Sequence, residues 1–218
     1  MNTFILLSNK KSRIPKEFQA DDNRFPESFV KYLIERYSKK GDKVIDIFAG
    51  LGTTLIVAEK LGRIPYGIEF DIKRVKFIRK KIKAKDNIKF GTAIFPDKYN
   101  LPKIDLCITS PPFMAITQKN DPLRSTKRYY ETYLDGLVDI FKKLKKHMKK
   151  NAYLFIEVSN LKGKHTTTLA WDLARKVSKV YFFEGEIVIG WTSKGTCKGS
   201  GNYGYGYDHS YCLVFRNK

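Results

Sequence analysis

The feature that most constrains the fold is a regular alternation of short apolar runs with segments of helical spacing. The apolar runs are rich in β-branched residues and span 43–50, 65–71, 104–110, 152–160, 185–191 and 210–216. Segments such as 27–40 and 133–150 have the spacing of amphipathic helices. This alternation predicts a parallel, doubly wound α/β sheet of Rossmann-like type. No helical segment joins the last two runs, so we expect them to form a hairpin that adds an antiparallel strand at the end of the sheet.

The chain of 218 residues has the length and the 42% hydrophobic content of one folded globular domain. We therefore expect a single domain over 1–218, with an N-terminal arm at 1–24. Two regions, 113–130 and 192–209, do not fit regular elements. Both are expected to emerge near the carboxyl edge of the sheet, where open α/β folds bind ligands.

The net charge of +20 points to a polyanionic partner, and nucleic acid comes first because its backbone is a dense row of phosphates. A membrane surface is the rival reading. However, no apolar run reaches 18 residues, and the apolar stretch at 4–7 is too short for a signal-peptide core. We expect a cytoplasmic protein that binds no membrane. Cys107, Cys197 and Cys212 lack zinc-ligand spacing, so no metal is expected, and Cys107 and Cys212 read as buried thiols.

A glycine-rich turn, DIFAGLGTT at 46–54, places Gly50 and Gly52 between the first strand and a helix. Such a turn lets a ligand approach the backbone and the helix N-terminus, although alone it is equally compatible with a tightly packed turn. The third glycine of the dinucleotide motif and the G-K-[ST] of a P-loop are both missing. Glu69, at the end of the next strand, can accept hydrogen bonds from both hydroxyls of a ribose. Taken alone, Glu69 could also be a carboxylate at the start of a helix or a member of a surface ion pair.

Residues 25–71 resemble the cofactor half of S-adenosylmethionine-dependent amino-methyltransferases that modify nucleic-acid bases. The resemblance continues with SPPF at 110–113, with 133–158 and with 208–218. It implies the class I methyltransferase fold, S-adenosylmethionine as cofactor, and no metal. The cofactor half precedes SPPF, whereas many SPP-aromatic DNA enzymes have the opposite order.

The resemblance also assigns roles to residues of the cofactor site. It places Phe25, Pro26 and Glu27 near the methionine end, and gives Glu69 the ribose. Thr92 stands where the family often has an Asp that meets the adenine. The full set of expected cofactor-binding residues is Phe25, Pro26, Glu27, Asp46, Phe48, Ala49, Gly50, Gly52, Thr53, Thr54, Glu69, Phe70, Thr92 and Ala93. Ile47 and Leu51 replace a usual proline and a frequent serine.

The SPPF motif gives a chemical reason to end a strand with two prolines. The Ser110 hydroxyl and a carbonyl of the Pro111–Pro112 turn can accept both hydrogens of an exocyclic amine and hold it in line for methyl transfer. Phe113 is expected to stack on the extruded base. In isolation the motif also reads as a strand-terminating turn with an aromatic plug. After a glycine loop and an acid in the same α/β unit, we interpret Ser110, Pro111, Pro112 and Phe113 as catalytic.

In the family that the chain resembles, the SPP-aromatic form is typical of cytosine N4 enzymes and of some adenine N6 enzymes. The resemblance therefore implies cytosine N4 as the first target and leaves adenine N6 open. Cytosine C5 methylation needs a nucleophilic cysteine that attacks the ring. Cys107 lies inside the strand, three residues before Ser110, which is a poor position for such a nucleophile, so we reject this reaction. Protein-amide methylation is disfavoured because serine replaces asparagine.

We expect no separate target-recognition domain within 1–218, since neither of the two insertions is large enough to fold alone. A compact basic domain suits structured RNA, with ribosomal RNA favoured and DNA as the alternative. The expected substrate-binding residues are Lys119, Arg124, Lys127, Arg128, Lys194, Lys198, Tyr203, Tyr205 and Tyr207. The lysine runs at 73–85 and 142–150 read by default as solvated helix faces.

A non-catalytic RNA-binding module with the same fold stays open, and cofactor binding would discriminate it from an enzyme. His147, His165 and His209 show no paired carboxylate or serine in the sequence and are expected to be surface or structural residues and not catalytic ones.

Overall fold

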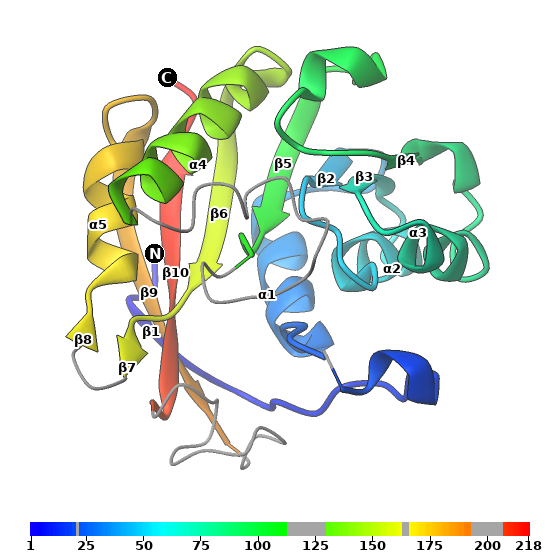
Figure 1. Ribbon diagram of the computed structural model, residues 1–218, viewed down its shortest axis with the longest axis horizontal. Helices are drawn as coiled ribbons and strands as arrows, with labels where there is room; N and C mark the ends of the chain where they lie inside the picture. Colours follow the sequence, from blue (N-terminus) through cyan, green and yellow to red (C-terminus); the bar gives the residue numbers. More distant parts are fainter. Residues whose placement is uncertain (21, 113–129, 163–165, 193–206) are drawn as a thin grey trace.

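The computed structural model describes residues 1–20, 22–112, 130–162, 166–192 and 207–218. Its centre is an eight-stranded sheet (Figure 1). In spatial order the strands are β1 (Phe4–Leu7), β9 (Phe182–Trp191), β10 (His209–Arg216), β6 (Met148–Val158), β5 (Ile104–Thr109), β2 (Lys43–Asp46), β3 (Ile64–Glu69) and β4 (Ile88–Phe90). Every pairing is parallel except those of β10, which is antiparallel to both of its neighbours. The predicted α/β architecture with an antiparallel C-terminal strand is therefore confirmed.

The expected position of the last strand is wrong, because β10 lies inside the sheet, between β9 and β6, and not at its end. The physical reason is its composition. Four consecutive residues of β10, from Cys212 to Phe215, are at most 1% exposed. A continuous apolar run is typical of a strand that is covered on both faces, and an edge position would leave it open to water.

The sheet ends instead at β1, which belongs to the N-terminal arm and pairs with β9. Ile5 is buried, whereas Phe4 and Leu6 are 61% and 62% exposed. This alternation marks a strand with one covered face. The arm is thus partly built into the sheet.

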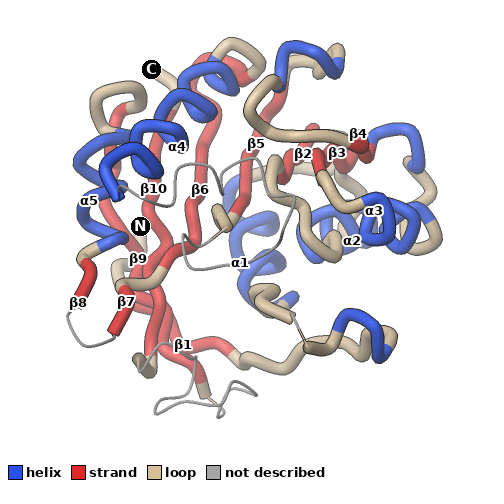
Figure 2. Tube along the Cα trace, viewed as in Figure 1, coloured by secondary structure: helices blue, strands red, loops and turns tan. Residues whose placement is uncertain are grey.

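In the described part of the chain, five α-helices cover the sheet in two layers (Figure 2). They are α1 (Glu27–Tyr37), α2 (Thr53–Lys60), α3 (Ile72–Arg79), α4 (Tyr130–Lys145) and α5 (Leu169–Val177). Helices α4 and α5 bury one face, and α1 and α2 bury the other. Successive residues of a central strand point to opposite layers: Ile45 packs in the α4–α5 cluster and Val44 in the α1–α2 cluster. Helix α3 packs with α2 around Ile78 and Val75.

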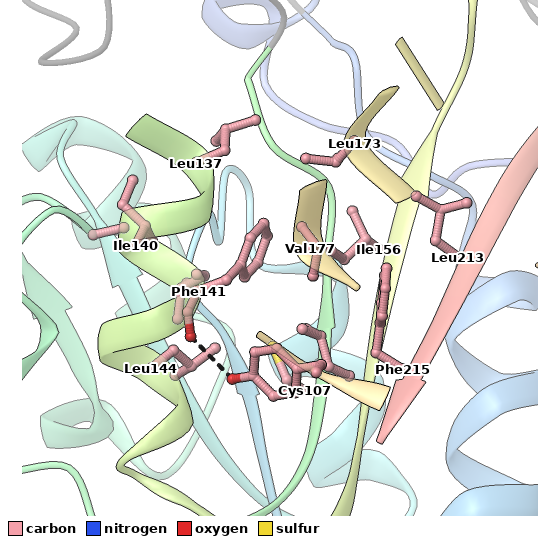
Figure 3. Packing of buried hydrophobic residues seen from close by; sticks show 14 of the residues in the cluster. Cys107, Leu137, Ile140, Phe141, Leu144, Ile156, Leu173, Val177, Leu213 and Phe215 are labelled. Atoms are coloured by element: carbon pink, nitrogen blue, oxygen red, sulfur yellow. Dashed lines mark hydrogen bonds between the residues drawn. The ribbon is translucent and has the colours of Figure 1, made fainter. Parts of the chain in front are cut away.

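The α4–α5 layer forms the larger part of the core (Figure 3). Side chains of both helices point toward the sheet, and the labelled ones are Leu137, Ile140, Phe141, Leu144, Leu173 and Val177. The buried Tyr181 hydroxyl donates a hydrogen bond to the Phe141 carbonyl over 3.0 Å, which satisfies a polar group inside this apolar cluster. Two short strands, β7 (Leu161–Lys162) and β8 (Thr166–Thr167), form a separate antiparallel pair, and there are 3₁₀ turns at Lys16–Phe18, Lys85–Asn87 and Pro96–Tyr99.

The predicted helix over 133–150 is too long at its C-terminal end. Helix α4 stops at Lys145, and β6 starts at Met148, which pairs with Ile104 and is 2% exposed. Of the two lysine-rich runs expected on helices, the one at 142–150 is therefore only partly helical. The one at 73–85 continues past the end of α3 at Arg79. His147, expected to lack a carboxylate partner, has its Nε2 2.7 Å from Oδ1 of Asp97.

Cys107 and Cys212 are fully buried free thiols, as predicted. Cys197 lies outside the described residues. Within the described ranges, no helix is long and apolar enough to cross a membrane. The same ranges contain no group of three or more His, Cys, Asp or Glu side chains arranged to hold a metal ion.

Candidate active site

A cavity opens at the carboxyl ends of β2, β3 and β5 and encloses about 1160 Å³, including open solvent at its mouth. Strand β2 pairs with β3 on one side and with β5 on the other, so the order in which the strands are added to the sheet changes direction at β2. Open α/β sheets bind ligands at such a switch point. The lining residues are Asn23, Arg24, Phe25, Asp46, Ile47, Phe48, Ala49, Gly50, Leu51, Thr53, Ile68, Glu69, Phe70, Arg74, Gly91, Thr92, Ala93, Ile94, Ser110, Pro111, Pro112 and Ile140.

The glycine-rich turn forms one wall of this cavity, and both of its glycines have positive φ. Gly50 has φ +55° and Gly52 has φ +79°. A Cβ on Gly52 would lie 2.7 Å from Cγ1 of Ile78, so both the backbone conformation and the packing against α3 require glycine. Around Gly50 the space is open, and only the backbone conformation requires glycine. The turn then delivers the chain into α2, which begins at Thr53.

The buried Asp46 carboxylate holds the glycine-rich turn in place through hydrogen bonds. Its carboxylate accepts hydrogen bonds from Thr54 Oγ1 at 2.8 Å, from Thr109 Oγ1 at 2.7 Å and from the Phe48 N–H at 3.1 Å. Burial raises the pKa of Asp46 to about 6, although the three hydrogen bonds favour the charged form. One buried side chain thus connects β2, α2 and β5.

Glu69 lies at the end of β3 on the cavity wall and is 4% exposed. Its Oε2 accepts the Gly50 N–H at 2.7 Å, and its Oε1 accepts the Asp71 N–H at 2.9 Å. Burial raises the pKa of Glu69 to about 7, against the effect of these two bonds and of the Arg74 charge. A carboxylate oxygen accepts more than one hydrogen bond, so each retains capacity for a ligand hydroxyl.

Thr53, in the first turn of α2, contributes an unsatisfied group to the same wall. Its Oγ1 is buried and finds no hydrogen-bond partner among the described residues. A buried hydroxyl without a partner is costly, and a polar ligand atom would satisfy it.

The residues before α1 reach the cavity only in part. Phe25 lines it, whereas Pro26 and Glu27 do not. Pro26 is the N-cap of α1, and the Glu27 carboxylate accepts hydrogen bonds from the Ser12 N–H at 3.1 and 3.4 Å. Asn23 and Arg24 line the cavity but were not predicted. Their only sequence signal is that they directly precede Phe25.

The two-proline turn forms the opposite wall, with Ser110, Pro111 and Pro112 all exposed to the cavity. The Ser110 hydroxyl donates a hydrogen bond to Oε2 of Glu157 over 3.1 Å. Glu157 is 2% exposed and lies near the end of β6. The Pro112 carbonyl accepts a hydrogen bond from the Tyr133 hydroxyl at 2.7 Å.

Neither Glu157 nor Tyr133 was predicted as a site residue. Glu157 had a signal, because it is the only charged residue in the apolar run 152–160 and lies near the end of its strand. For Tyr133 the sequence offers nothing beyond its position on an amphipathic helix.

Most of the predicted cofactor residues line the cavity together. The exceptions are Pro26, Glu27, Gly52 and Thr54, of which Gly52 and Thr54 support the wall from behind through Ile78 and Asp46. Several predicted residues lie outside the described part of the chain: Phe113, Lys119, Arg124, Lys127, Arg128, Lys194, Lys198, Tyr203, Tyr205 and also His165. Tyr207 is described and its ring contacts that of His209.

Comparison with known proteins supports the resemblance drawn from the sequence. Residues 3–80 match the N6/N4 methyltransferase family model, which is described as DNA methylase. The type II methyltransferase M2.DpnII of Streptococcus pneumoniae is 34% identical over 77 residues, which are 34% of this chain and 29% of that protein. The resemblance to nucleic-acid amino-methyltransferases is thereby confirmed in the N-terminal part of the chain.

Solved structures extend the comparison to the fold. TrmN from Thermus thermophilus matches with a TM-score of 0.62 at 15% identity, over 91% of this chain and 50% of that one. A TehB-like SAM-dependent methyltransferase from Corynebacterium glutamicum matches with a TM-score of 0.60 at 15% identity, over 93% of this chain and 94% of that one. The chain therefore has the class I methyltransferase fold. It spans about half the length of TrmN, and its match covers less than a third of the curated relative.

Proposed function

We propose that this protein transfers a methyl group from S-adenosylmethionine to the exocyclic amine of a nucleic-acid base, with cytosine N4 in RNA as the first candidate. The observation that carries the proposal is the hydrogen bond between Ser110, on the cavity wall, and the buried carboxylate of Glu157 behind it. Because the Ser110 hydroxyl gives its hydrogen to Glu157, the oxygen of that hydroxyl is left with lone pairs to accept an amine hydrogen.

The residues of the opposite wall suit the proposed cofactor. Glu69 would accept the ribose hydroxyls on its two carboxylate oxygens, and Thr53 would bond a polar atom of the ligand. Phe25, Phe48 and Phe70 supply apolar surface on the cavity lining. When bound, S-adenosylmethionine supplies an electrophilic methyl group on its sulfonium.

The two-proline turn would position the target amine. The lone pair of an exocyclic amine is conjugated into its ring, which makes the amine a poor nucleophile. The amine attacks when its two hydrogens are held so that the lone pair is released from the ring and directed at the methyl group. Ser110 Oγ would accept one hydrogen and a carbonyl of the turn the other. As the N–C bond formed, the S–CH₃ bond of the sulfonium would break and leave S-adenosylhomocysteine. The surplus proton on nitrogen would pass to Ser110 Oγ, and the serine proton would pass to Glu157 Oε2.

RNA is the preferred substrate because the chain carries a net charge of +20 on a compact catalytic fold. A second candidate is DNA, modified at cytosine N4 or adenine N6. It is favoured by the description of the matching family model as DNA methylase and by the type II methyltransferase among the relatives.

Methyl transfer from labelled S-adenosylmethionine to purified ribosomal RNA, transfer RNA and duplex DNA tests the proposal. The modified nucleoside is identified by mass spectrometry, with Ser110→Ala as the inactive control. We expect N4-methylcytidine in RNA with the wild type and none with the variant. Label in DNA alone establishes the second candidate. Cofactor binding by calorimetry without label in any acceptor would contradict the proposal in favour of a non-catalytic module.

A further inference from the structure

Four aromatic rings form a continuous row on the α4–α5 side of the sheet. The Trp171 ring of α5 contacts Tyr211 of β10 with ring centroids 6.4 Å apart. Tyr211 contacts His209 at 5.2 Å, and His209 contacts Tyr207 at 5.4 Å. All three contacts are edge-on, and Trp171 is 58% exposed although it is one of the largest apolar side chains. Tyr207, His209 and Tyr211 are half-buried, so the row is a contiguous, partly exposed aromatic surface, and such surfaces mark binding sites.

The row lies at the carboxyl edge of the sheet, close to the two-proline turn. Tyr211 pairs with Val158 on the α4–α5 face of the sheet, and the adjacent pair, Cys212 with Glu157, points to the other face at the same edge. Glu157 is the partner of Ser110. Strand β10 is two steps from β5 across β6, so its backbone is about 10 Å from that of Ser110 at a strand spacing of about 4.8 Å. That separation is within the reach of one or two nucleotides.

Hydrogen bonds from α4 reach both α5, which carries Trp171, and the two-proline turn. Tyr130, at the start of α4, donates to Oδ2 of Asp172 over 2.9 Å, next to Trp171. One turn later on the same helix, Tyr133 donates to the Pro112 carbonyl. The first turn of α4 is thus bonded both to α5, at the residue next to Trp171, and to the two-proline turn.

Basic side chains flank the row at both ends. Lys162 Nζ lies 5.9 Å from the centroid of the Tyr207 ring. Arg175 follows Trp171 by one helical turn, and its side chain is 73% exposed. Aromatic faces combined with cations are the features with which proteins bind unpaired nucleotides, because bases stack on the rings while the cations meet phosphates.

We propose that Trp171, Tyr211, His209 and Tyr207 form a stacking platform for unpaired bases that flank the target nucleotide. The substrate is then a single-stranded loop or end, and a continuous duplex is disfavoured. This inference rests on the proposed function for its biological meaning, but the binding it predicts can be measured without methyl transfer.

Fluorescence anisotropy with a labelled single-stranded RNA of about 12 nucleotides, and with the same strand in a duplex, tests the platform. We expect tighter binding of the single strand and a loss of about 5- to 100-fold in Trp171→Ala, since stacking contributes about 1–3 kcal/mol per base. Trp171→Phe should restore most of that affinity because it keeps an aromatic face.

The chain offers a matched control in Phe182. It is 50% exposed and has a cation, Lys218, 3.3 Å from its ring centroid, but it lies at the amino end of β9, on the opposite edge of the sheet. Phe182→Ala should leave RNA affinity unchanged. Equal losses in the Trp171 and Phe182 variants, no loss in Trp171→Ala, or preference for the duplex would each overturn the inference.

Two further measurements distinguish failure of the stacking platform from failure of the proposed methyl transfer. Calorimetric titration with S-adenosylmethionine should be unaffected by Trp171→Ala, because the cofactor cavity does not include Trp171. Single-strand binding that depends on Trp171 without methyl transfer supports the platform and contradicts the enzyme. Methyl transfer to RNA that is insensitive to Trp171→Ala supports the enzyme and overturns the platform. If Trp171→Ala instead changes the sedimentation of the protein alone and leaves RNA affinity intact, a second copy covers the surface and the inference is wrong.

Discussion

Ser110 and Glu157 meet across two neighbouring parallel strands, with the serine hydroxyl 3.1 Å from the carboxylate. The pair exists because β5 and β6 are in register at Thr109 and Ile156, which brings the next residue of each strand to the same level. A serine that ends a strand beside a buried carboxylate is oriented by it. This relationship gives the first prediction.

Replacement of Glu157 by glutamine should lower the rate of methyl transfer by about 10²- to 10⁴-fold, the range for loss of a general base. The amide cannot take up the proton that the Ser110 hydroxyl passes on. Cofactor affinity should stay unchanged, since Glu157 is not among the residues that line the cavity. Single-turnover kinetics with saturating RNA measure the chemical step. Glu186→Gln, a change on the exposed part of β9, is the control, and an equal effect there would refute the role of Glu157.

Cofactor affinity should depend on pH through Glu69. Burial holds the pKa of this carboxyl at about 7 in the free protein, and ribose hydroxyls would donate to its charged form. Binding therefore favours deprotonation. Affinity is full above pH 7 and decreases by up to tenfold per pH unit as the pH falls below 7. Calorimetric titrations between pH 5.5 and about pH 8.5 check this, with Glu69→Gln as a variant whose weaker binding should lose the pH dependence.

Gly52 should be less tolerant of alanine than Gly41. Both have strongly positive φ, +79° and +85°, but only at Gly52 would the new Cβ meet a neighbour, Cγ1 of Ile78 at 2.7 Å. Gly41→Ala should lower the free energy of unfolding by the backbone strain alone, about 1 kcal/mol. Gly52→Ala should lower it by a further amount of about 1–3 kcal/mol because of overpacking. Denaturant unfolding of both variants measures the difference. Equal destabilisation would show that the contact with Ile78 relaxes freely.

Tyr133 should contribute to the rate through the shape of the two-proline turn. Tyr133→Phe removes the hydrogen bond to the Pro112 carbonyl, whose net contribution is about 1 kcal/mol, and frees that carbonyl to move. We expect kcat to fall by about 5- to 10-fold, with little change in the KM for S-adenosylmethionine. Tyr66→Phe, a partly buried tyrosine elsewhere in the same core cluster, is the comparison. A change in KM alone would assign Tyr133 to binding and not to positioning.

The sequence predicted the parts of the site that depend on neighbours along the chain. The glycine turn, Glu69 and Ser110–Pro112 each follow directly from a strand that can be read as an apolar run, so their position at one sheet edge follows from parallel topology. The residues that were missed depend on contacts between distant segments. Glu157 becomes significant only because β6 lies beside β5.

The errors in the fold have the same origin. The position of β10 inside the sheet is decided by which strands it pairs with, and a hairpin with β9 is compatible with either an edge or an interior position. Helix α4 ends at Lys145 although Lys146 and His147 carry no helix-breaking signal, because the pairing of Met148 with Ile104 takes the chain into the sheet. Local propensity does not contain that information.

Stability should depend on pH through Asp46. Its pKa is about 6 in the folded protein and 3.8 as the ordinary value, so the folded state binds a proton more tightly than the unfolded state. Stability is therefore greatest below pH 4 with respect to this group and decreases by about 3 kcal/mol as the pH rises through 6. Thr109→Val removes one hydrogen-bond donor to the carboxylate and should destabilise the protein more at pH 8 than at pH 5, because only the charged form needs that donor. Urea unfolding at the two pH values measures the contrast, and Thr109→Ser, which keeps the hydroxyl, should reduce it. A loss that is equal at both pH values would mean that Thr109 acts through packing alone.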